Sequence, residues 1–252
     1  MIEKVKLAAV SYLNTIPFIY GIEQSELLLN SIDLRLEFPS KCADLLKSGQ
    51  VDIGLIPVAE IPNIPNAQII SDYCIGADGK VNTVMLYSHC PLHDIDTIAL
   101  DYQSRTSAKL IKILASEFWK IDVQFNQTSE GYIDQIQGKN AGLVIGDRAF
   151  DLNGKFPYQY YLSEEWYKFT GLPFVFACWV ANKPLSKTFT NAFDKATAFG
   201  IQNKSVAIRG YSKAANVNLV KYLNEDISYH LDTLKRKALE LFLDYIKSIT
   251  VE

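Results

Sequence analysis

The stretch IDLRLEFPSKCADLLKSGQVDIGLIP, residues 32–57, decides the fold. Apolar residues alternate between Ile32 and Phe38, which is the period of a β-strand. Residues 39–50 have helical spacing and meet a helix-stop signal at Gly49. The run 52–57 is apolar on both faces, as in the central strand of a sheet. Strand, helix and strand at this spacing predict a βαβ unit in a parallel sheet.

The same alternation of strands and helices continues along the chain and indicates an α/β protein. Further strands are predicted at Val5–Val10, Val81–Ser88, Thr97–Leu100, Val123–Phe125, Ala141–Ile145 and Phe174–Ala181. Helical spacing predicts a long helix that starts after Ser104 and a short one at residues 129–136. A C-terminal helix is predicted from an apolar stripe of Leu231, Leu234, Ala238, Leu241, Tyr245 and Ile249.

The domain organisation follows from chain length and from the missing linker. A chain of 252 residues without a Gly/Ser-rich stretch is expected to form two interleaved lobes. The first lobe is predicted to comprise residues 1–92 and 177–252, and the second residues 93–176. Two parallel-sheet lobes joined by a double crossover form a type II periplasmic-binding-protein-like fold. A ligand is then expected in the interlobe cleft, at loops that follow the strands.

Composition argues against several classes of protein. The net charge of −3 disfavours a general nucleic-acid binder. No apolar stretch reaches about 18 residues, so no membrane span is predicted, and the N-terminal residues show no secretory signal. The four cysteines and three histidines are scattered without a metal-ligand pattern. We therefore expect a cytoplasmic protein without a bound metal, and neither nucleic acid nor membrane as a partner.

The first candidate site is the loop SYLNTIP, which follows the first strand and leads into a helix. A loop rich in hydroxyl and amide groups at a helix start suits the recognition of an anion or a hydroxyl group. Thr15 can instead act as a helix N-cap before Pro17, which requires no ligand. The two interpretations are compatible, because Ser11 and Asn14 remain after the cap is assigned.

The second candidate is the segment from Asp101 to Ser107 at the start of the long helix. Hydroxyl groups and the guanidinium of Arg105 at the positive end of a helix favour the binding of a carboxylate. The alternative is a cap formed by Ser104 or Thr106, with Arg105 facing solvent.

Two further segments follow or precede predicted strands. Gly146 and Asp147 follow a buried strand, where a glycine permits close approach of a ligand to the backbone. Asp147 can accept a substrate hydroxyl, orient a donor or cap the next helix, and the cap is the simplest role. Thr83 follows an Asp-Gly turn, and it either faces a ligand or belongs to the turn alone. No catalytic triad, paired carboxylates or phosphate-binding loop is present.

Taken in order, these segments resemble the chorismate dehydratase family of the futalosine pathway of menaquinone biosynthesis. The matching segments are Val10–Pro17, Gly54–Val58, Ser104–Ser107, Gly146–Ala149 and Glu165–Ala177. They span about 170 residues. Two positions depart from the family pattern: Tyr161-Leu162-Ser163 stands where Asp-Leu-Gly is frequent, and Thr83 stands where a serine is usual.

The resemblance implies a carbon–oxygen lyase that removes water from chorismate to give 3-[(1-carboxyvinyl)oxy]benzoate, without a metal or an organic cofactor. It implies catalytic roles for Asn14 and Thr83. The substrate-binding residues it implies are Ser11, Tyr12, Asn14, Thr83, Ser104, Arg105, Thr106, Ser107, Gly146 and Asp147. The absence of a convincing protein base suggests that the enolpyruvyl carboxylate of the substrate takes the proton.

Two other functions remain open at this point. The same fold serves as a solute-binding module in transport, although no secretory signal is visible. A sister family forms 1,4-dihydroxy-6-naphthoate later in the same pathway. That family opens with a different loop, which contains Cys and Pro, so the Ser-Tyr-Leu-Asn loop favours the dehydratase.

Overall fold

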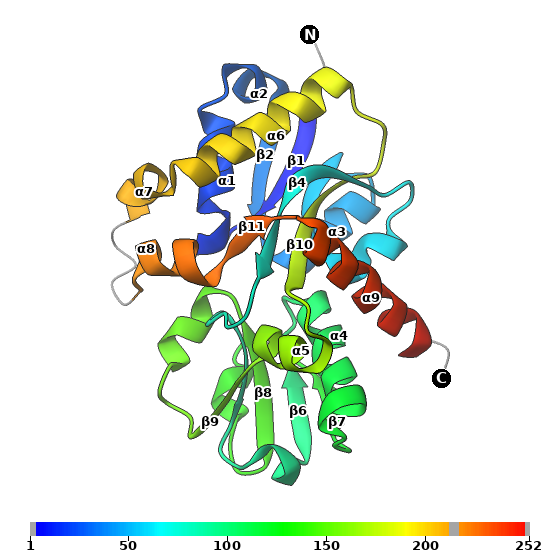
Figure 1. Cartoon of the computed structure of the whole chain (residues 1–252), viewed down its shortest axis with the longest axis vertical. Coiled ribbons are helices and arrows are strands. Elements are labelled where there is room, and N and C mark those ends of the chain that lie inside the picture. The colour runs from blue at the N-terminus through cyan, green and yellow to red at the C-terminus, as the bar shows by residue number, and fades with distance from the viewer. Residues whose placement is uncertain (1–3, 212–216, 250–252) are drawn as a thin grey trace. The chain divides into compact units, whose positions relative to one another are not determined.

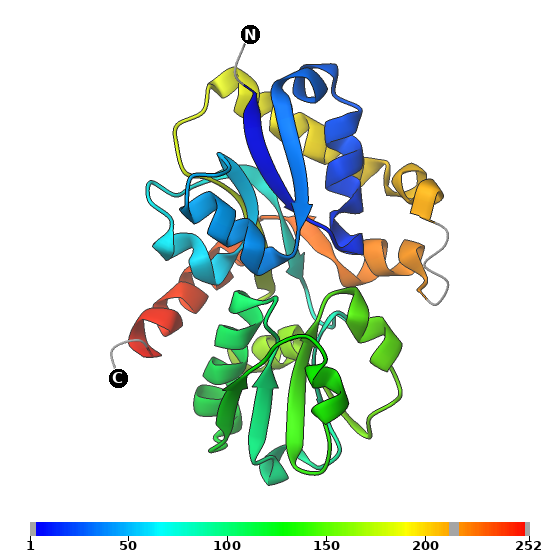
Figure 2. The ribbon, with the colours of Figure 1, turned by 180° about the vertical axis from the view of Figure 1, so that it is seen from behind.

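The computed structural model describes residues 4–211 and 217–249 (Figures 1 and 2). The ends of the predicted first lobe, residues 1–3 and 250–252, lie outside the described residues. The chain divides into two compact units. The first comprises Met1–Gly76 and Val175–Asp232, and the second comprises Ala77–Phe174 and Thr233–Glu252.

These units differ from the predicted lobes in two places. Strand β5 (Val84–Ser88) was expected in the first lobe, but it hydrogen-bonds to strands of the second sheet. Helix α9 (Thr233–Ile249) was also expected in the first lobe, but it packs on helix α4 (Arg105–Ile113) of the second unit. Hydrophobic periodicity identifies a strand or a helix, whereas its partners depend on tertiary contacts that the periodicity does not specify.

The first unit contains a six-stranded sheet with the order β11-β4-β10-β3-β1-β2. Its strands are β1 (Val5–Val10), β2 (Ile32–Glu37), β3 (Ile53–Pro57), β4 (Gln68–Ala77), β10 (Phe174–Ala181) and β11 (Ser228–His230). Strand β1 is parallel to β2 and β3, as the βαβ pattern predicts. Strand β10 is antiparallel to β3, and β11 is antiparallel to β4. The sheet is therefore mixed, and the prediction of a purely parallel sheet is wrong.

Helices on both faces bury this sheet. Helix α3 (Pro39–Lys47) packs on β3 and β1, in front of the sheet in Figure 2. On the other face, α1 (Ile16–Glu23) and α6 (Lys187–Gln202) lie side by side (Figure 1). The shorter segments are the helices α2 (Glu26–Ser31), α7 (Lys204–Ala207) and α8 (Leu219–Lys221), the 3₁₀ turns Leu13–Thr15, Val58–Asn63 and Ile208–Tyr211, and the π-helical turn Tyr222–Asp226.

Two glycines bring α1 and α6 into backbone contact. A Cβ atom at Gly21 would lie 1.9 Å from the Ala196 carbonyl oxygen, and a Cβ atom at Gly200 would lie 1.8 Å from that of Pro17. Helix axes come this close only where small residues face each other. The contact sets the position of α1, and with it the end of the loop that follows β1.

The second unit contains a five-stranded mixed sheet with the order β7-β6-β8-β5-β9. The strands other than β5 are β6 (Thr97–Leu100), β7 (Gln124–Gln127), β8 (Asn140–Ile145) and β9 (Tyr158–Tyr161). Strand β6 is parallel to β7 and β8, whereas β5 is antiparallel to β8 and β9. The parallel prediction thus holds only for one side of this sheet.

Apolar layers cover both faces of the second sheet. On one face, α4, its π-helical continuation Leu114–Trp119, α5 (Leu162–Thr170) and α9 surround Trp166, which contacts the rings of Phe174 and Phe242. On the other face, the 3₁₀ turns Tyr132–Gln135 and Asp147–Leu152 cover a smaller cluster. That cluster contains Met85, Tyr87, Tyr132, Ile136, Val144, Ala149 and Leu152. A further 3₁₀ turn spans Leu92–Asp94.

The buried face of α9 differs from its predicted stripe. Leu234 is 58% exposed, although it belongs to the expected apolar face. Lys235 is buried, and its ammonium group pairs with Asp78 at 2.7 Å. Ala238 and Phe242 are buried on the same side. Of the predicted stripe, Leu231 and Ala238 are buried as expected and Leu234 is exposed, while the Lys235–Asp78 ion pair lies on the buried side of the helix.

Candidate functional site

The loop after β1 carries the three predicted site residues of the first unit. Ser11 is exposed, and its backbone N–H donates to the Glu37 carbonyl at 2.9 Å, which continues the β1–β2 pairing. Tyr12 is half-buried and precedes the 3₁₀ turn Leu13–Thr15. Asn14 is only 9% exposed. The end of a parallel strand therefore presents a hydroxyl, a phenol and an amide within four residues.

Thr15 has a role other than the predicted cap. It occupies the N-cap position of α1, but its hydroxyl makes no capping hydrogen bond. Instead, Thr15 Oγ1 donates to Asn14 Oδ1 at 3.2 Å. The Asn14 carbonyl accepts a hydrogen bond of 2.8 Å from Tyr229 Oη. Burial raises the pKa of Tyr229 well above its ordinary value, so its hydroxyl remains a donor.

In the second unit, the carboxylate of Asp101 joins several segments. Its side chain is completely buried. It accepts hydrogen bonds from the Ile145 backbone at 2.8 Å, Tyr132 Oη at 2.9 Å and the Gln103 backbone at 3.0 Å. Arg148 Nη2 lies 2.8 and 2.7 Å from its two oxygens. A buried carboxylate needs hydrogen-bond donors around it, and these donors come from different segments, so Asp101 fixes the ends of β6 and β8 relative to each other.

Tyr132 takes part in this arrangement through the hydrogen bond from its hydroxyl group to Asp101. Burial and the neighbouring Asp101 raise the pKa of Tyr132 far above its ordinary value. The phenol therefore stays protonated, and its single proton lies between two acceptors, the Leu143 carbonyl at 2.6 Å and the Asp101 carboxylate at 2.9 Å.

The start of α4 directly follows Asp101. Ser104 occupies the N-cap, and its hydroxyl accepts from the Ser107 backbone at 3.1 Å, which confirms the predicted cap. Ser104 Oγ also donates to Ser107 Oγ at 2.9 Å. Thr106 is buried, whereas Arg105 is half-exposed at the first helical position. A half-exposed guanidinium at a positive helix terminus is suited to bind an anion.

The turn after β8 connects two more predicted residues. Gly146 has φ 71° and ψ −160°, a conformation that only glycine adopts readily. Its backbone N–H donates to the Thr83 carbonyl at 2.9 Å. Thr83 is buried in the turn before β5. Gly146 holds the N-cap position of the following 3₁₀ turn and Asp147 is its first residue, so a hydrogen bond from the turn to the Asp147 side chain stays a prediction.

The predicted residues thus fall into two groups. The first-unit group, which we call the β1 loop, contains Ser11, Tyr12 and Asn14. The second-unit group, which we call the Asp101 cluster, contains Thr83, Ser104, Arg105, Thr106, Ser107, Gly146 and Asp147. Hydrogen bonds join parts of the second group: Ser104 donates its backbone N–H to the Asp101 carbonyl, Ser107 bonds to Ser104, and Gly146 donates to the Thr83 carbonyl. Ile145, which precedes Gly146, donates its backbone N–H to the Asp101 carboxylate.

Arg148 was not predicted as a site residue. Its guanidinium contacts Asp101 and lies 5.4 Å from the ring centre of Tyr102. The side chain is 32% exposed. A signal was present, because an arginine after one buried strand and an aspartate after another are typical of a pair at the shared edge of a parallel sheet. Arg148 adds a second guanidinium to the Asp101 cluster, although Asp101 compensates its charge.

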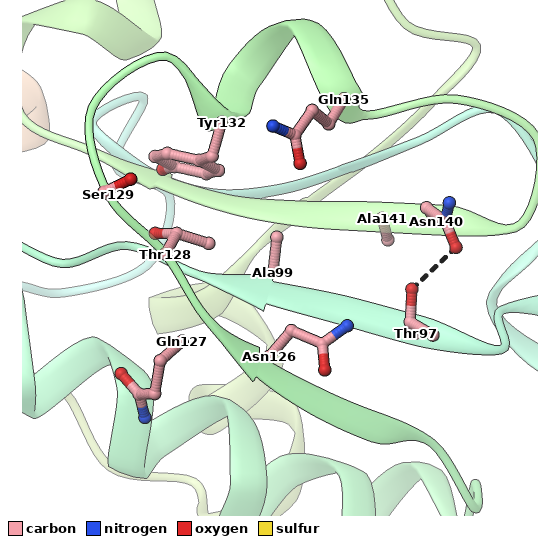
Figure 3. A pocket seen from close by; sticks show the side chains of 10 residues that line it. All are labelled: Thr97, Ala99, Asn126, Gln127, Thr128, Ser129, Tyr132, Gln135, Asn140 and Ala141. Atoms are coloured by element: carbon pink, nitrogen blue, oxygen red, sulfur yellow. Dashed lines mark hydrogen bonds between the residues drawn. The ribbon is translucent and has the colours of Figure 1, made fainter.

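A pocket of about 270 Å³ lies elsewhere on the second unit (Figure 3). Its floor is Ala99, and the amides of Asn126 and Gln135 face it from opposite sides. It is lined by Thr97, Ala99, Asn126, Gln127, Thr128, Ser129, Tyr132, Gln135, Asn140 and Ala141. None of these side chains carries a positive charge, so the lining is poorly suited to a dianion such as chorismate.

Within residues 4–211 and 217–249, no three His, Cys, Asp or Glu side chains come together in a way that could hold a metal ion. In the same part of the chain, each helix is too short or too polar to cross a bilayer.

Sequence comparison relates the chain to a biosynthetic family. A family model described as menaquinone biosynthesis matches residues 5–248. The chorismate dehydratase of Thermus thermophilus is 24% identical over 228 residues, which cover 82% of this chain and 83% of that protein. The chorismate dehydratase of Campylobacter jejuni is 24% identical over 224 residues, which cover 81% of this chain and 98% of that protein.

Structural comparison concerns the fold alone. A crystal structure of an Archaeoglobus fulgidus protein has a TM-score of 0.76 at 14% identity and covers 99% of this chain and 98% of its own. A Candida albicans protein described as having the generic periplasmic binding protein fold has a TM-score of 0.66 at 15% identity, with coverage of 100% and 91%. The Escherichia coli aliphatic sulphonate binding protein SsuA has a TM-score of 0.59 at 13% identity, with coverage of 98% and 94%. The fold is periplasmic-binding-protein-like, with two mixed sheets.

Proposed function

The chain belongs to the menaquinone biosynthesis family, and we propose that within this family it is a chorismate dehydratase. The observation that carries the proposal is the match to two chorismate dehydratases over more than four fifths of the chain. Three of the ordered segments support it, because Val10–Pro17 contains the β1 loop and Ser104–Ser107 and Gly146–Ala149 contain members of the Asp101 cluster.

The two groups of residues are assigned different parts of the substrate. The start of α4 receives a carboxylate of chorismate, because Arg105 and the helix terminus supply positive charge there. Asn14 and Ser11 contact the ring or its hydroxyl group, with Tyr12 beside them. Thr83, Gly146 and Asp147 complete the contacts from the Asp101 cluster.

The proposed reaction is a redox-neutral elimination. The ring carbon that bears the ether oxygen loses its proton, and the electron pair is delocalised toward the ring carboxylate. The C–O bond to the neighbouring hydroxyl group then breaks, and the hydroxyl leaves with a proton as water. The ring becomes aromatic, which drives the reaction. The protein has to fix one conformer and stabilise the developing charge, and Asn14 and Thr83 are the residues assigned to that role.

The base in this proposal is the enolpyruvyl carboxylate of the substrate itself. The enolpyruvyl group is bonded through its ether oxygen to the ring carbon that loses the proton, so proton transfer is intramolecular. A well-oriented intramolecular base has a large effective molarity, which accelerates the transfer. Asp147 is the rival base, because it is the acidic residue in the turn that directly follows β8, next to the Gly146 loop.

The test is incubation of the purified protein with chorismate, followed by mass spectrometry. We expect loss of water and an aromatic product. Binding of chorismate without turnover would support the solute-binding alternative. No reaction and no binding would overturn the proposal and favour the sister enzyme that forms 1,4-dihydroxy-6-naphthoate.

A further inference from the structure

In the described part of the chain, the side-chain amide of Asn14 has a hydrogen-bond partner at its oxygen but none at its nitrogen. Its Oδ1 accepts the hydrogen bond from Thr15. Among residues 4–211 and 217–249, no group accepts a hydrogen bond from its Nδ2. Asn14 is nevertheless only 9% exposed. Its Nδ2 is not one of the described side-chain atoms that are both fully buried and unpaired, so this amide nitrogen reaches solvent from an otherwise buried residue.

This asymmetry has a chemical consequence. Thr15 Oγ1 has no hydrogen-bond partner other than Asn14 in the described part of the chain. Because the hydroxyl donates to Oδ1, the NH₂ group of Asn14 must point the other way. The described part of the chain thus leaves the Asn14 NH₂ group available to a hydrogen-bond acceptor from elsewhere.

A second contact holds the backbone of the same residue. Tyr229 Oη donates to the Asn14 carbonyl, and the residues are far apart in sequence. The Tyr229 ring is itself fixed, because Phe18 packs against it edge-on with ring centres 5.3 Å apart, and Lys204 Nζ lies 5.4 Å from its centre. Lys204 is held in turn by its hydrogen bond of 2.9 Å to the Leu223 carbonyl.

We propose that Thr15 and Tyr229 are positioning residues that aim the Asn14 amide donor at the leaving hydroxyl group of the substrate. Thr15 sets the orientation of the side chain, and Tyr229 sets the position of the backbone. This inference rests on the proposed dehydratase function. A donor aimed at the leaving oxygen acts mainly in the transition state, where that oxygen gains negative charge.

The main experiment compares isosteric variants of two buried threonines. Thr15→Val removes the hydroxyl and keeps the shape, and Thr15→Ser restores the hydroxyl. Thr197→Val is the matched control, because Thr197 is equally buried in the first unit but bonds only to carbonyls of its own helix. We expect kcat to fall about 10- to 100-fold in Thr15→Val with KM changed less than about threefold, since small displacements of a catalytic group have effects of this size.

The variants separate positioning from packing. Thr15→Ser is expected to recover kcat to within about threefold, and Thr197→Val to stay within about twofold of the wild type. A wild-type kcat in Thr15→Val would overturn the inference. Equal losses in Thr15→Val and Thr15→Ser, or an equal loss in Thr197→Val, would also overturn it and assign Thr15 to packing.

A second measurement does not depend on turnover. The side-chain NH₂ signals of Asn14, assigned by their absence in Asn14→Asp, are expected to be sharp in the wild type and to shift or broaden in Thr15→Val and Tyr229→Phe. They are expected to remain unchanged in Thr197→Val. If the wild type fails to convert chorismate but the signals respond as expected, the proposed function fails and the orienting contacts stand. Unchanged signals in Thr15→Val would overturn the orienting role.

Discussion

Asp101 is buried, yet its hydrogen bonds connect the segments that carry the candidate site residues of the second unit. Donors from the β6 loop, the 3₁₀ turn at Tyr132, the end of β8 and Arg148 converge on its carboxylate. Each charge-assisted hydrogen bond of this kind stabilises the folded protein more than a neutral one does. The cluster therefore holds the α4 terminus and the Gly146 turn in a fixed relation before any ligand binds.

Arg105 is expected to contribute charge to ligand binding rather than to folding. Its half-exposed position at the start of α4 leaves it accessible to a substrate carboxylate. Losing one charged hydrogen-bond partner costs about 1.5–3 kcal/mol, so Arg105→Ala should weaken chorismate binding at least about tenfold. Calorimetric titration measures this, with Lys109→Ala, one helical turn further on, as the control. Unchanged affinity in Arg105→Ala would remove Arg105 from the site and leave the hydroxyl groups.

Asp147 distinguishes a protein base from a substrate base. Asp147→Asn is nearly isosteric and leaves Gly146 in its N-cap position. If the substrate carboxylate takes the proton, turnover should fall by less than about tenfold, whereas removal of a general base costs about 10²- to 10⁴-fold. Single-turnover rates with bound chorismate measure this, with Asp151→Asn from the same 3₁₀ turn as the control. A loss of about 10³-fold with retained binding would make Asp147 the base.

Predictions for single residues were confirmed where the hydrogen-bond partner lies within the same turn of the chain. Ser104 caps α4 as predicted, because its hydroxyl has the Ser107 backbone donor within the same turn. Thr15 failed to cap α1, because the Asn14 side chain offered a competing acceptor that sequence spacing does not reveal. The contact between Arg148 and Asp101 joins the ends of two strands, so it depends on the order of strands in the sheet.

At the scale of elements, most strands with strong periodicity were predicted, whereas helix α6 (Lys187–Gln202) and several short strands were not. Strands β4, β9 and β11 were not predicted. Their sequences mix polar and aromatic residues, and β9 and β11 have only four and three residues. The direction of each strand could not be predicted from the sequence pattern, because apolar alternation is the same in parallel and antiparallel strands. For that reason both sheets were expected to be parallel and are mixed.

The α1–α6 contact gives a prediction in which two effects have opposite signs. Replacing a helical glycine by alanine ordinarily stabilises a helix by up to about 1 kcal/mol. At Gly200 the new Cβ would collide with the Pro17 carbonyl, so α1 and α6 must move apart. We expect Gly200→Ala to lower the free energy of unfolding by about 1–3 kcal/mol, the usual range for overpacking. Urea denaturation measures it.

The control for this prediction lies on the same helix. Lys195 is exposed on α6, and Lys195→Ala should change the free energy of unfolding by less than about 0.5 kcal/mol. A stabilised or unchanged Gly200→Ala protein would show that the two helices tolerate a wider separation than their backbone contact indicates.

At the scale of the whole molecule, neither unit is a continuous piece of chain. The chain passes between them after Gly76, after Phe174 and again after Asp232. Chain length and the missing linker predicted two interleaved lobes, whereas the final return of α9 to the second unit was not predicted. It depends on Phe242 filling the space beside Trp166 and Phe174, a contact between residues far apart in sequence.

Buried groups that lose a proton at alkaline pH occur in both units. Burial, and then the nearby Glu37, raise the pKa of the Cys42 thiol from 9.0 to about 12. Burial is also the largest cause of the raised pKa values of Tyr87, Tyr132 and Tyr229. The folded protein keeps these protons at pH values at which the unfolded chain releases them.

The whole molecule should therefore lose stability as the pH rises above about 9. Unfolding releases protons in this range, so its free energy falls with increasing pH, by about 1.4 kcal/mol per pH unit for each group that is fully ionised only in the unfolded chain. Cys42 contributes from its ordinary pKa of 9.0 up to about 12, and the tyrosines contribute from about pH 10. Urea denaturation at pH 8, 9, 10 and 11 measures the slope.

Cys42→Ala should be less stable than the wild type at pH 8, because it leaves a small cavity, but its free energy of unfolding should decline less steeply from pH 9 to 10. Parallel curves for the two proteins would show that Cys42 is not a source of the alkaline sensitivity.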